Sequence, residues 1–419
     1  MLLSKHDVWL RSLSVLFALA SVYGIYRLAK QLFDRETALL SSFFLSISPL
    51  FINHAQEVRY YIVSLFFGIV GSLYFCKYKY RLNSSQQYLN RSVWIVARVL
   101  AAFTTPLNFV FIVSDFFLDT VIFIARKTKF TWRNISVFLL DYFLITVAIL
   151  PVAISVYQSS GAHKLTPPIP GISHVLRQIR IFFVYAHVPS PKLLAIFLQL
   201  MILTILTVLA FALWQGKHQK YVISIAVWAL LPILIVFVFS HVFYSVWISR
   251  YILSSLPYLT ILLSLGLIEL WKRFRIVAII ILSLYLLASG AGLFKYYTTK
   301  SRYIRASDRY RAVAHYVCRD RQKGEFLVWS ILHKMTLPFT HYCDRDFSIY
   351  SLDLPSKTRD RKELTAWVDS IPSSNSEFWL IYSRDSKPLL PSLQEKFTIE
   401  EHKKIDGFSI FLLRNKEQK

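Results

Sequence analysis

Acidic side chains are scarce over the first two thirds of this 419-residue chain. Only eight of the 24 Asp and Glu residues lie before residue 297. Runs such as 135–157 and 221–243 carry at most one charged residue each. Each run approaches the ~20 apolar residues that cross a hydrocarbon core of ~30 Å. This scarcity excludes a large soluble helical protein and indicates a polytopic membrane protein, in line with a mean hydropathy of +0.45.

Other features are also missing. The C-terminal part has no Gly-rich phosphate loop, which argues against a nucleotide site there. The histidines of the 158–192 segment lack zinc-ligand spacing. There are three cysteines: Cys76 ends an apolar run, and Cys318 and Cys343 either form a disulfide or remain thiols. The net charge of +24 is a weak sign of nucleic-acid binding, because the basic residues cluster between apolar runs.

Hydropathy predicts about ten spans. The fourth is short and, with the fifth, is also consistent with one helical hairpin. The predicted spans are 10–28, 37–52, 60–75, 92–103, 107–125, 135–157, 193–214, 221–243, 251–270 and 276–294.

The loops differ in Lys and Arg content. Sixteen such residues lie in the segments 27–35, 77–91, 126–133, 217–220 and 272–275, and six lie in the alternate loops. The positive-inside rule makes the first set cytoplasmic. The alternate loops and the C-terminal region are then extracytoplasmic, and the topology calls for one more span before Met1.

The pattern changes near residue 298, which predicts a membrane domain over 1–297 and an extracytoplasmic α/β domain over 298–419. Alternating strands and helices indicate the second domain. Helices are expected at 305–321, 332–342 and 360–370, strands at 326–330, 347–352 and 378–382, and a final hairpin over 397–413.

The short loop after Ser48-Pro49 gathers polar side chains between two spans. The candidate residues are His54, Gln56, Glu57, Arg59 and Tyr60. Ionisable groups at a membrane boundary are costly to keep and suggest function. The alternative is an Arg59–Glu57 pair that only anchors the end of the span.

Three further features have open alternatives. Arg250-Tyr251, on the same side, suits a lipid phosphate or an interfacial anchor. The segment 175–184 is predicted as an amphipathic helix, near a lipid entrance or as a passive surface helix. Asp115 and Asp119 share one helix face and indicate a buried structural contact, with no basic partner evident, or proton coupling in a transporter.

Several motifs together resemble glycosyltransferase family 39, which includes protein O-mannosyltransferases and bacterial aminoarabinose transferases. Their order and spacing carry the likeness over nearly the whole chain. They are Trp9 to Val15, Tyr26 to Phe33, Ser48-Pro49-Leu50, Gln56 to Tyr61, Thr105 to Asn108, Ser249-Arg250-Tyr251 with Leu256-Pro257, and Arg309 to Tyr316.

The resemblance implies a GT-C fold and transfer of a sugar from a polyprenyl-phosphate donor to a lipid, protein or glycan hydroxyl outside the cytoplasm. It also implies an Asp-Glu pair in the first outer loop as general base. That loop and its preceding span have no counterpart here, and His6-Asp7 lies at the wrong place. Either the coding sequence begins further upstream or this is a truncated copy.

The sequence therefore predicts a glycosyltransferase of the plasma (inner) membrane. Glu57 is the candidate catalytic residue, which orients the acceptor or assists a divalent metal ion. His54, Gln56, Arg59, Tyr60, Arg250 and Tyr251 are the candidate substrate-binding residues. The alternatives are a non-catalytic homologue and a transporter or lipid flippase, although no internal repeat is evident.

Overall fold

The computed structural model describes most of the chain, and its two compact units are Met1–Lys295 and Tyr296–Lys419. The described residues are 7–57, 59–80, 86–125, 132–159, 168–184, 204–214, 219–298, 306–319, 326–330, 348–352, 361–371, 377–382, 386–405 and 408–416.

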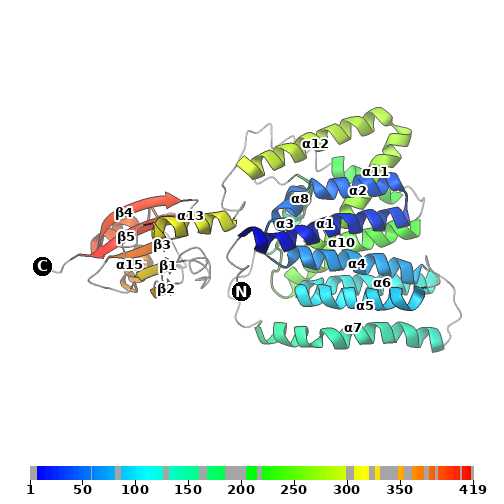
Figure 1. Cartoon of the computed structure of the whole chain (residues 1–419), viewed down its shortest axis with the longest axis horizontal. Helices are drawn as coiled ribbons and strands as arrows, with labels where there is room; N and C mark the ends of the chain where they lie inside the picture. The colour runs from blue at the N-terminus through cyan, green and yellow to red at the C-terminus, as the bar shows by residue number, and fades with distance from the viewer. Residues whose placement is uncertain are drawn as a thin grey trace. The chain divides into compact units, whose positions relative to one another are not determined.

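The first unit is a helix bundle (Figure 1). Its helices are α1 (Asp7–Leu32), α2 (Arg35–Ser46), α3 (Pro49–Ala55), α4 (Tyr61–Lys79), α5 (Gln87–Thr104), α6 (Phe109–Ala125), α7 (Trp132–Ser159), α8 (Ile172–Phe183), α10 (Gln219–Val242), α11 (Leu256–Arg273) and α12 (Arg275–Thr298), with short 3-10 turns η2 (Pro106–Asn108) and η4 (Leu253–Ser255). A further helix covers Thr204–Trp214.

Seven helices of the described chain are long and apolar enough to cross a membrane, or eight if α2 and α3 form one bent span. Helix α5 and Thr204–Trp214 account for the other predicted spans; residues 193–203 of the latter lie outside the described residues. The expected class, a polytopic helical protein with a small C-terminal α/β part, is confirmed.

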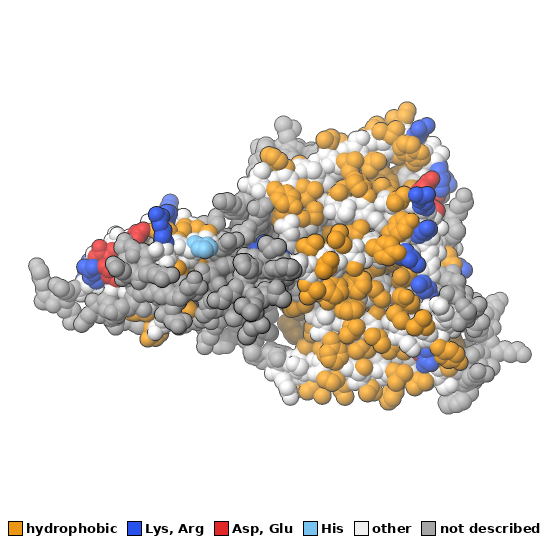
Figure 2. All heavy atoms as spheres, in the orientation of Figure 1, with side chains coloured by type: hydrophobic (Ala, Val, Ile, Leu, Met, Phe, Trp, Pro, Cys, Tyr) orange, Lys and Arg blue, Asp and Glu red, His pale blue; other side chains and the backbone are white. Residues whose placement is uncertain are grey.

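Lipid-facing composition is visible on the bundle surface. Figure 2 shows hydrophobic side chains over the sides of the bundle and Lys and Arg gathered at one of its ends. Exposed apolar residues recur along the helices, as on α1, where Leu16 and Leu19 are 62% and 63% exposed. Because such patches are rare on soluble monomers, they fit a bundle solvated by lipid.

The C-terminal unit contains one five-stranded sheet with the order β2-β1-β3-β5-β4. The strands are β1 (Phe326–Ser330), β2 (Ser348–Leu352), β3 (Phe378–Tyr382), β4 (Phe397–Ile405) and β5 (Phe408–Asn415). Strands β1, β2 and β3 are parallel, whereas β5 is antiparallel to both β3 and β4. A bulge at Ile399/Glu401 shifts the register of the outer hairpin.

Helices cover both faces of this sheet. Alternate residues of β3 point to opposite sides: Trp379 packs in a cluster with α13 (Ala306–Cys318), and Leu380 packs in one with α15 (Arg361–Asp369) and α16 (Leu390–Lys396). This alternation follows from the period of two in a strand. The unit is therefore a three-layer α/β sandwich.

Most elements predicted for this unit are present, with two differences. The short helix α16 was not predicted, because its seven residues are too few to show a helical apolar pattern. The predicted helix 332–342 lies outside the described residues. Cys318 is disulfide-bonded, whereas Cys76 is a free, buried thiol; Cys343 lies outside the described residues.

Candidate functional site

A sharp break between α2 and α3 positions the candidate loop. The two helices meet at 65°. Ser48 caps α3, its hydroxyl donates to the Phe182 carbonyl of α8 at 2.8 Å, and Pro49 follows in the first turn. In Figure 1, α3 and α8 lie together at the end of the bundle opposite the Lys and Arg end.

Glu57 is held by three neighbours. Its carboxylate contacts His54 Nδ1 at 3.1 Å and accepts a bond from Asn53 Nδ2 at 3.3 Å. Its carbonyl accepts a bond from Ser14 Oγ of α1 at 2.9 Å. The Glu57 side chain is 29% exposed and that of His54 only 7%. The carboxylate is therefore held in place by His54 and Asn53, and part of it remains exposed.

Opposing effects act on the Glu57 carboxyl. Burial raises its pKa, but the hydrogen bond and charge of His54, followed by the charge of Arg59, bring the pKa below the ordinary value. Glu57 is thus ionised at neutral pH and can only accept hydrogen bonds. Because its pKa is lowered, the carboxylate is a weak base and suits orienting a hydroxyl better than removing its proton.

Tyr61 connects this loop to the Arg250-Tyr251 segment. Its ring lies edge-on to His54, with 5.4 Å between ring centroids. The Arg250 guanidinium lies 5.9 Å from the centre of the same ring and 5.2 Å from that of Tyr251. Two segments about 190 residues apart in sequence therefore meet in one place.

Arg250 is half-buried, and its Nε atom has no hydrogen-bond partner among the described residues. The adjacent Ser249 hydroxyl donates to Gln178 Oε1 of α8 at 2.8 Å. Burial lowers the pKa of the Arg250 guanidinium, but the ring oxygens of Tyr61, Tyr251 and Tyr60 raise it above its ordinary value. The guanidinium is a permanent cation beside the Glu57 loop.

The other candidate residues lie around this core. Gln56 ends α3, and Arg59 and Tyr60 are exposed. The Tyr60 ring packs on Tyr61 at 4.7 Å, and burial together with that contact raises the pKa of Tyr60 to about 12. The Glu57 carboxylate contacts His54, and the backbone N–H of Arg59 donates to the Glu57 carbonyl, while the charge of Arg59 acts on the carboxylate at longer range.

Sequence reasoning missed the residues that link these segments. Asn53, Gln178 and, as a bridge, Tyr61 are needed to hold the two charged groups in place. Asn53 and Gln178 are 8% and 3% exposed. For Gln178 the signal was an amide inside the predicted helix 175–184, and for Asn53 it was an amide next to His54 in the polar loop, because buried polar groups need partners.

The side chains around Glu57 offer few ligands for a metal ion. His54 and Glu57 supply one nitrogen and one carboxylate. Within the described part of the chain, no group of three or more His, Cys, Asp or Glu residues is placed to hold a metal ion. Because divalent ions such as Mg²⁺ favour several oxygen ligands, we derive no step through a metal.

The arrangement of the helices has known counterparts. Crystal structures of ArnT from Cupriavidus metallidurans superpose on the chain: the apo form with a TM-score of 0.57 at 12% identity, over 96% of this chain and 83% of ArnT. The form bound to undecaprenyl phosphate gives 0.53 at 14% identity, over 96% and 84%. The chain has the GT-C fold.

The likeness to ArnT is one of fold and confirms the GT-C fold expected from the motifs. No protein-family model matches the chain, and no curated protein matches it in sequence. At this identity the fold is shared although most side chains differ. The residues of the site must therefore be judged by their own geometry.

Inside the GT-C bundle lies a buried ionic network that sequence reasoning did not foresee. Arg98 Nε and Nη2 bond to the two oxygens of Asp115 at 2.6 and 2.9 Å, and the indoles of Trp94 and Trp228 donate to the same carboxylate at 2.7 and 2.8 Å. All four side chains are fully buried.

A second buried pairing lies close to the first. Lys79 Nζ lies 2.5 Å from Asp119 and 3.2 Å from Asp141. Arg91 Nε bonds to the other oxygen of Asp141 at 2.5 Å. The expectation that Asp115 and Asp119 lack basic partners is wrong, since both are ion-paired. Their interpretation as structural contacts agrees with this full pairing.

Proposed function

We propose that the chain is a membrane glycosyltransferase that transfers a sugar from a polyprenyl-phosphate donor to a hydroxyl acceptor on the extracytoplasmic side. The observation that carries the proposal is the contact of one ring, Tyr61, with both His54 and Arg250. Through it a carboxylate and a cation share one site. The fold common to this chain and to ArnT bound to undecaprenyl phosphate supports a lipid-linked donor.

Each charged group has a distinct task in this proposal. Arg250, with Arg59 at the loop surface, binds the donor phosphate and offsets the charge that develops as the bond between the anomeric carbon and the phosphate oxygen breaks. Glu57 accepts a hydrogen bond from the attacking hydroxyl and orients it. The hydroxyl oxygen forms the new glycosidic bond, and its proton leaves with the phosphate or to water.

Other side chains complete the binding surface. His54 and Asn53 fix the direction of the Glu57 carboxylate. Gln56, Tyr60 and Tyr251 line the same loop region and offer polar edges and ring faces to a sugar. Exposed tyrosine rings suit this task because they combine apolar contact with a hydroxyl donor.

Two observations support the extracytoplasmic side. The site lies at the end of the bundle opposite the gathered Lys and Arg, which the positive-inside rule assigns to the cytoplasm. The disulfide at Cys318 also fits an oxidising compartment. The proposal thus assigns 1–297 to the transmembrane domain in the inner membrane and 298–419 to an extracytoplasmic domain.

Transfer assays on the purified full chain in proteoliposomes test the proposal. A panel of sugars on undecaprenyl phosphate serves as donors, with lipid, peptide and glycan acceptors. We expect at least one donor to be used, and Arg250→Ala to lower the transfer rate by at least about 100-fold, as loss of a charge-stabilising donor does.

A matched control separates this role from general charge loss. Arg177→Ala removes an exposed cation from the adjacent α8 and should leave the rate unchanged. Native mass spectrometry should also show that the Arg250 variant retains less undecaprenyl phosphate. Normal transfer by the Arg250 variant would refute the assignment, and a folded chain that uses no donor would favour the non-catalytic homologue.

A further inference from the structure

We propose a binding site for an anionic phospholipid on the outer face of α1 and α4, at the Lys and Arg end of the bundle. The inference is independent of the proposed transferase function and concerns the opposite end of the molecule. It rests on three cations that bond to no carboxylate of the described residues and on an apolar track that leads to them.

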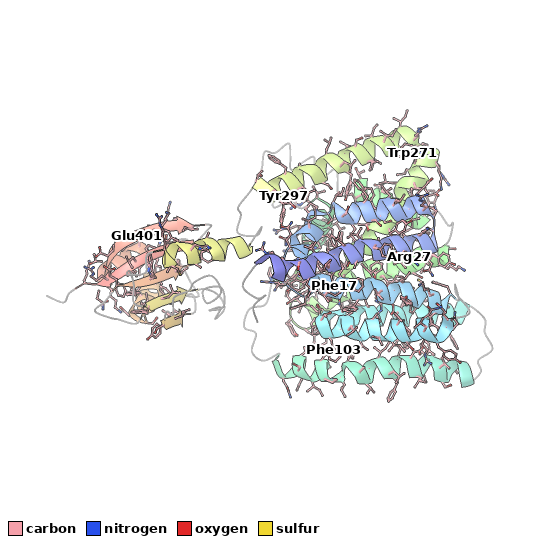
Figure 3. All side chains as sticks on the ribbon, in the orientation of Figure 1. Phe17, Arg27, Phe103, Trp271, Tyr297 and Glu401 are labelled. Atoms are coloured by element: carbon pink, nitrogen blue, oxygen red, sulfur yellow. The ribbon has the colours of Figure 1, made fainter. Side chains whose placement is uncertain are left out.

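The cations come from two adjacent helices. Arg27 and Lys30 lie in the last turns of α1, and Lys77 lies near the end of α4. The two helices pack against each other, and the like charges of Arg27 and Lys77 are close enough to interact. Figure 3 places Arg27 at the same end of the bundle as Trp271 of α11. The repulsion among these like charges would be reduced by a bound anion.

Each of these cations lies against a tyrosine ring. Arg27, Lys30 and Lys77 are 5.7, 5.6 and 4.3 Å from the ring centres of Tyr23, Tyr26 and Tyr74, respectively, and Arg27 Nη1 also donates to the Tyr23 hydroxyl at 2.9 Å. Tyrosines favour the headgroup level of a bilayer. The rings hold the charged ends while leaving them open to a phosphate.

Acidic partners distinguish this cluster from other cations at the same end. Lys79 and Arg91 bond to buried aspartates, and Lys272 bonds to Glu269 at 2.8 Å. Within the described part of the chain, no carboxylate bonds to Arg27, Lys30 or Lys77. Their charge is therefore available to a ligand.

An apolar track runs along α1 to the cluster. Leu13, Leu16, Leu19 and Tyr23 are 57–63% exposed and recur at helical spacing on one face. Phe17 on this helix packs on Phe66 of α4, with 5.3 Å between ring centroids, and lies nearer the middle of the bundle than Arg27 does (Figure 3). Arg27 lies eleven positions after Leu16, about 16 Å along the helix, which is close to the depth of one leaflet.

The apolar track and the cation cluster together favour a lipid over a free anion. The track offers contact to acyl chains, and the cluster offers several donors to a phosphate. Each basic residue near an anionic surface contributes about 1 kcal/mol, or roughly fivefold in affinity. We therefore expect phosphatidylglycerol of the adjacent leaflet, cytoplasmic by the positive-inside rule, to be retained over phosphatidylcholine.

Native mass spectrometry of the full chain, titrated with dioleoyl phosphatidylglycerol or dioleoyl phosphatidylcholine in detergent, tests this. We expect the triple variant Arg27→Gln, Lys30→Gln, Lys77→Gln to weaken phosphatidylglycerol binding by at least about tenfold and to leave phosphatidylcholine binding unchanged. The variant Arg27→Lys, Lys30→Arg, Lys77→Arg keeps the charges and should restore binding.

Lys272→Gln is the matched control, since it removes a cation of the same end that Glu269 already neutralises. It should change phosphatidylglycerol binding by less than about twofold. The proposal fails if the wild-type chain binds both lipids equally, if Lys272→Gln costs as much as the triple variant, or if inorganic phosphate at millimolar concentration displaces the lipid completely. Gel filtration and circular dichroism of each variant report whether it is folded.

Discussion

At the scale of single residues, the contact with His54 keeps the Glu57 carboxyl ionised. Its ring bonds to the carboxylate from a nearly buried position, while the other side of the carboxylate stays open. Burial by itself would favour the protonated acid, and the imidazole reverses that preference. The pair therefore keeps a carboxylate ionised in surroundings that disfavour charge.

We predict that His54→Gln raises the pKa of Glu57, because the opposing effect of burial then acts with less compensation. Glu57 must be ionised to accept the hydrogen bond from the attacking hydroxyl. The acid limb of the pH profile of kcat/KM should therefore move to higher pH. Rates measured across pH in proteoliposomes give the limb. Glu269→Gln, at the other end of the bundle, should leave it in place; an unmoved limb in the His54 variant would contradict the role.

The lowered pKa of Glu57 also makes the stability of the folded chain depend on pH. The folded-state pKa of Glu57 lies below its unfolded value of about 4.3. Its ionic contacts therefore contribute stability that is present above that value and lost as the pH falls through the folded-state pKa. We predict that Glu57→Gln makes thermal stability less sensitive to acid in this range. A variant as acid-sensitive as the wild type would argue against it.

Ion pairing between helices decides stability at the scale of elements. Arg98 of α5 and Asp115 of α6 are fully buried and bonded to each other. We predict that Asp115→Leu alone lowers the free energy of unfolding by about 3–5 kcal/mol, since it strands a buried guanidinium. Unfolding in mixed detergent micelles measures the loss.

The double variant Arg98→Met, Asp115→Leu provides the control. Because neither charge then remains buried, it should be more stable than the Asp115→Leu variant. A double variant that loses the sum of both single losses would mean that packing around the side chains, and not their charge, decides the stability.

The close contact of α11 with the helix Thr204–Trp214 leads to a second prediction at this scale. A Cβ atom on Gly266 of α11 would lie 2.3 Å from the backbone oxygen of Val208, whereas one on Gly290 of α12 would meet nothing within 4 Å. Gly266→Ala should cost about 1–3 kcal/mol in unfolding free energy, as overpacking does. Gly290→Ala should be neutral or slightly stabilising. Equal melting temperatures for both variants would contradict the packing.

Elements were more predictable than the contacts between them. The strands β1, β3 and β5 follow from local apolar patterns, and the helix α8 from its amphipathic spacing. The ion pair of Arg98 with Asp115 joins two spans, and periodicity carries no information on which helices pack together. The same reason hid the contact of Tyr61 with Arg250, although each motif was identified by itself.

The two units of the whole molecule differ in how they are stabilised. The helical unit contains one free buried cysteine, Cys76, whereas Cys318 of the sheet unit is disulfide-bonded. We predict that Cys318→Ser lowers the stability of the sheet unit by about 2–5 kcal/mol. Calorimetry of the full chain should show one transition moving to lower temperature.

Reductant is the control for this effect. Added to the wild-type chain, it should move the same transition, and added to the Cys318 variant it should change nothing further. A Cys76→Ala chain should respond to reductant like the wild type. A transition that ignores reductant would show that the disulfide does not limit unfolding.

The hairpin of α5 and α6 has a consequence for biogenesis. Arg98 and Asp115 lie the same number of residues from the turn Thr105–Asn108, at matching depth on two neighbouring segments. Each charge alone opposes transfer into hydrocarbon, but together they cancel before either meets lipid. The two segments should therefore pass from the translocon into the bilayer as one insertion unit, and a nascent chain stopped after Thr104 should fail to integrate its last segment in a glycan-reporter assay.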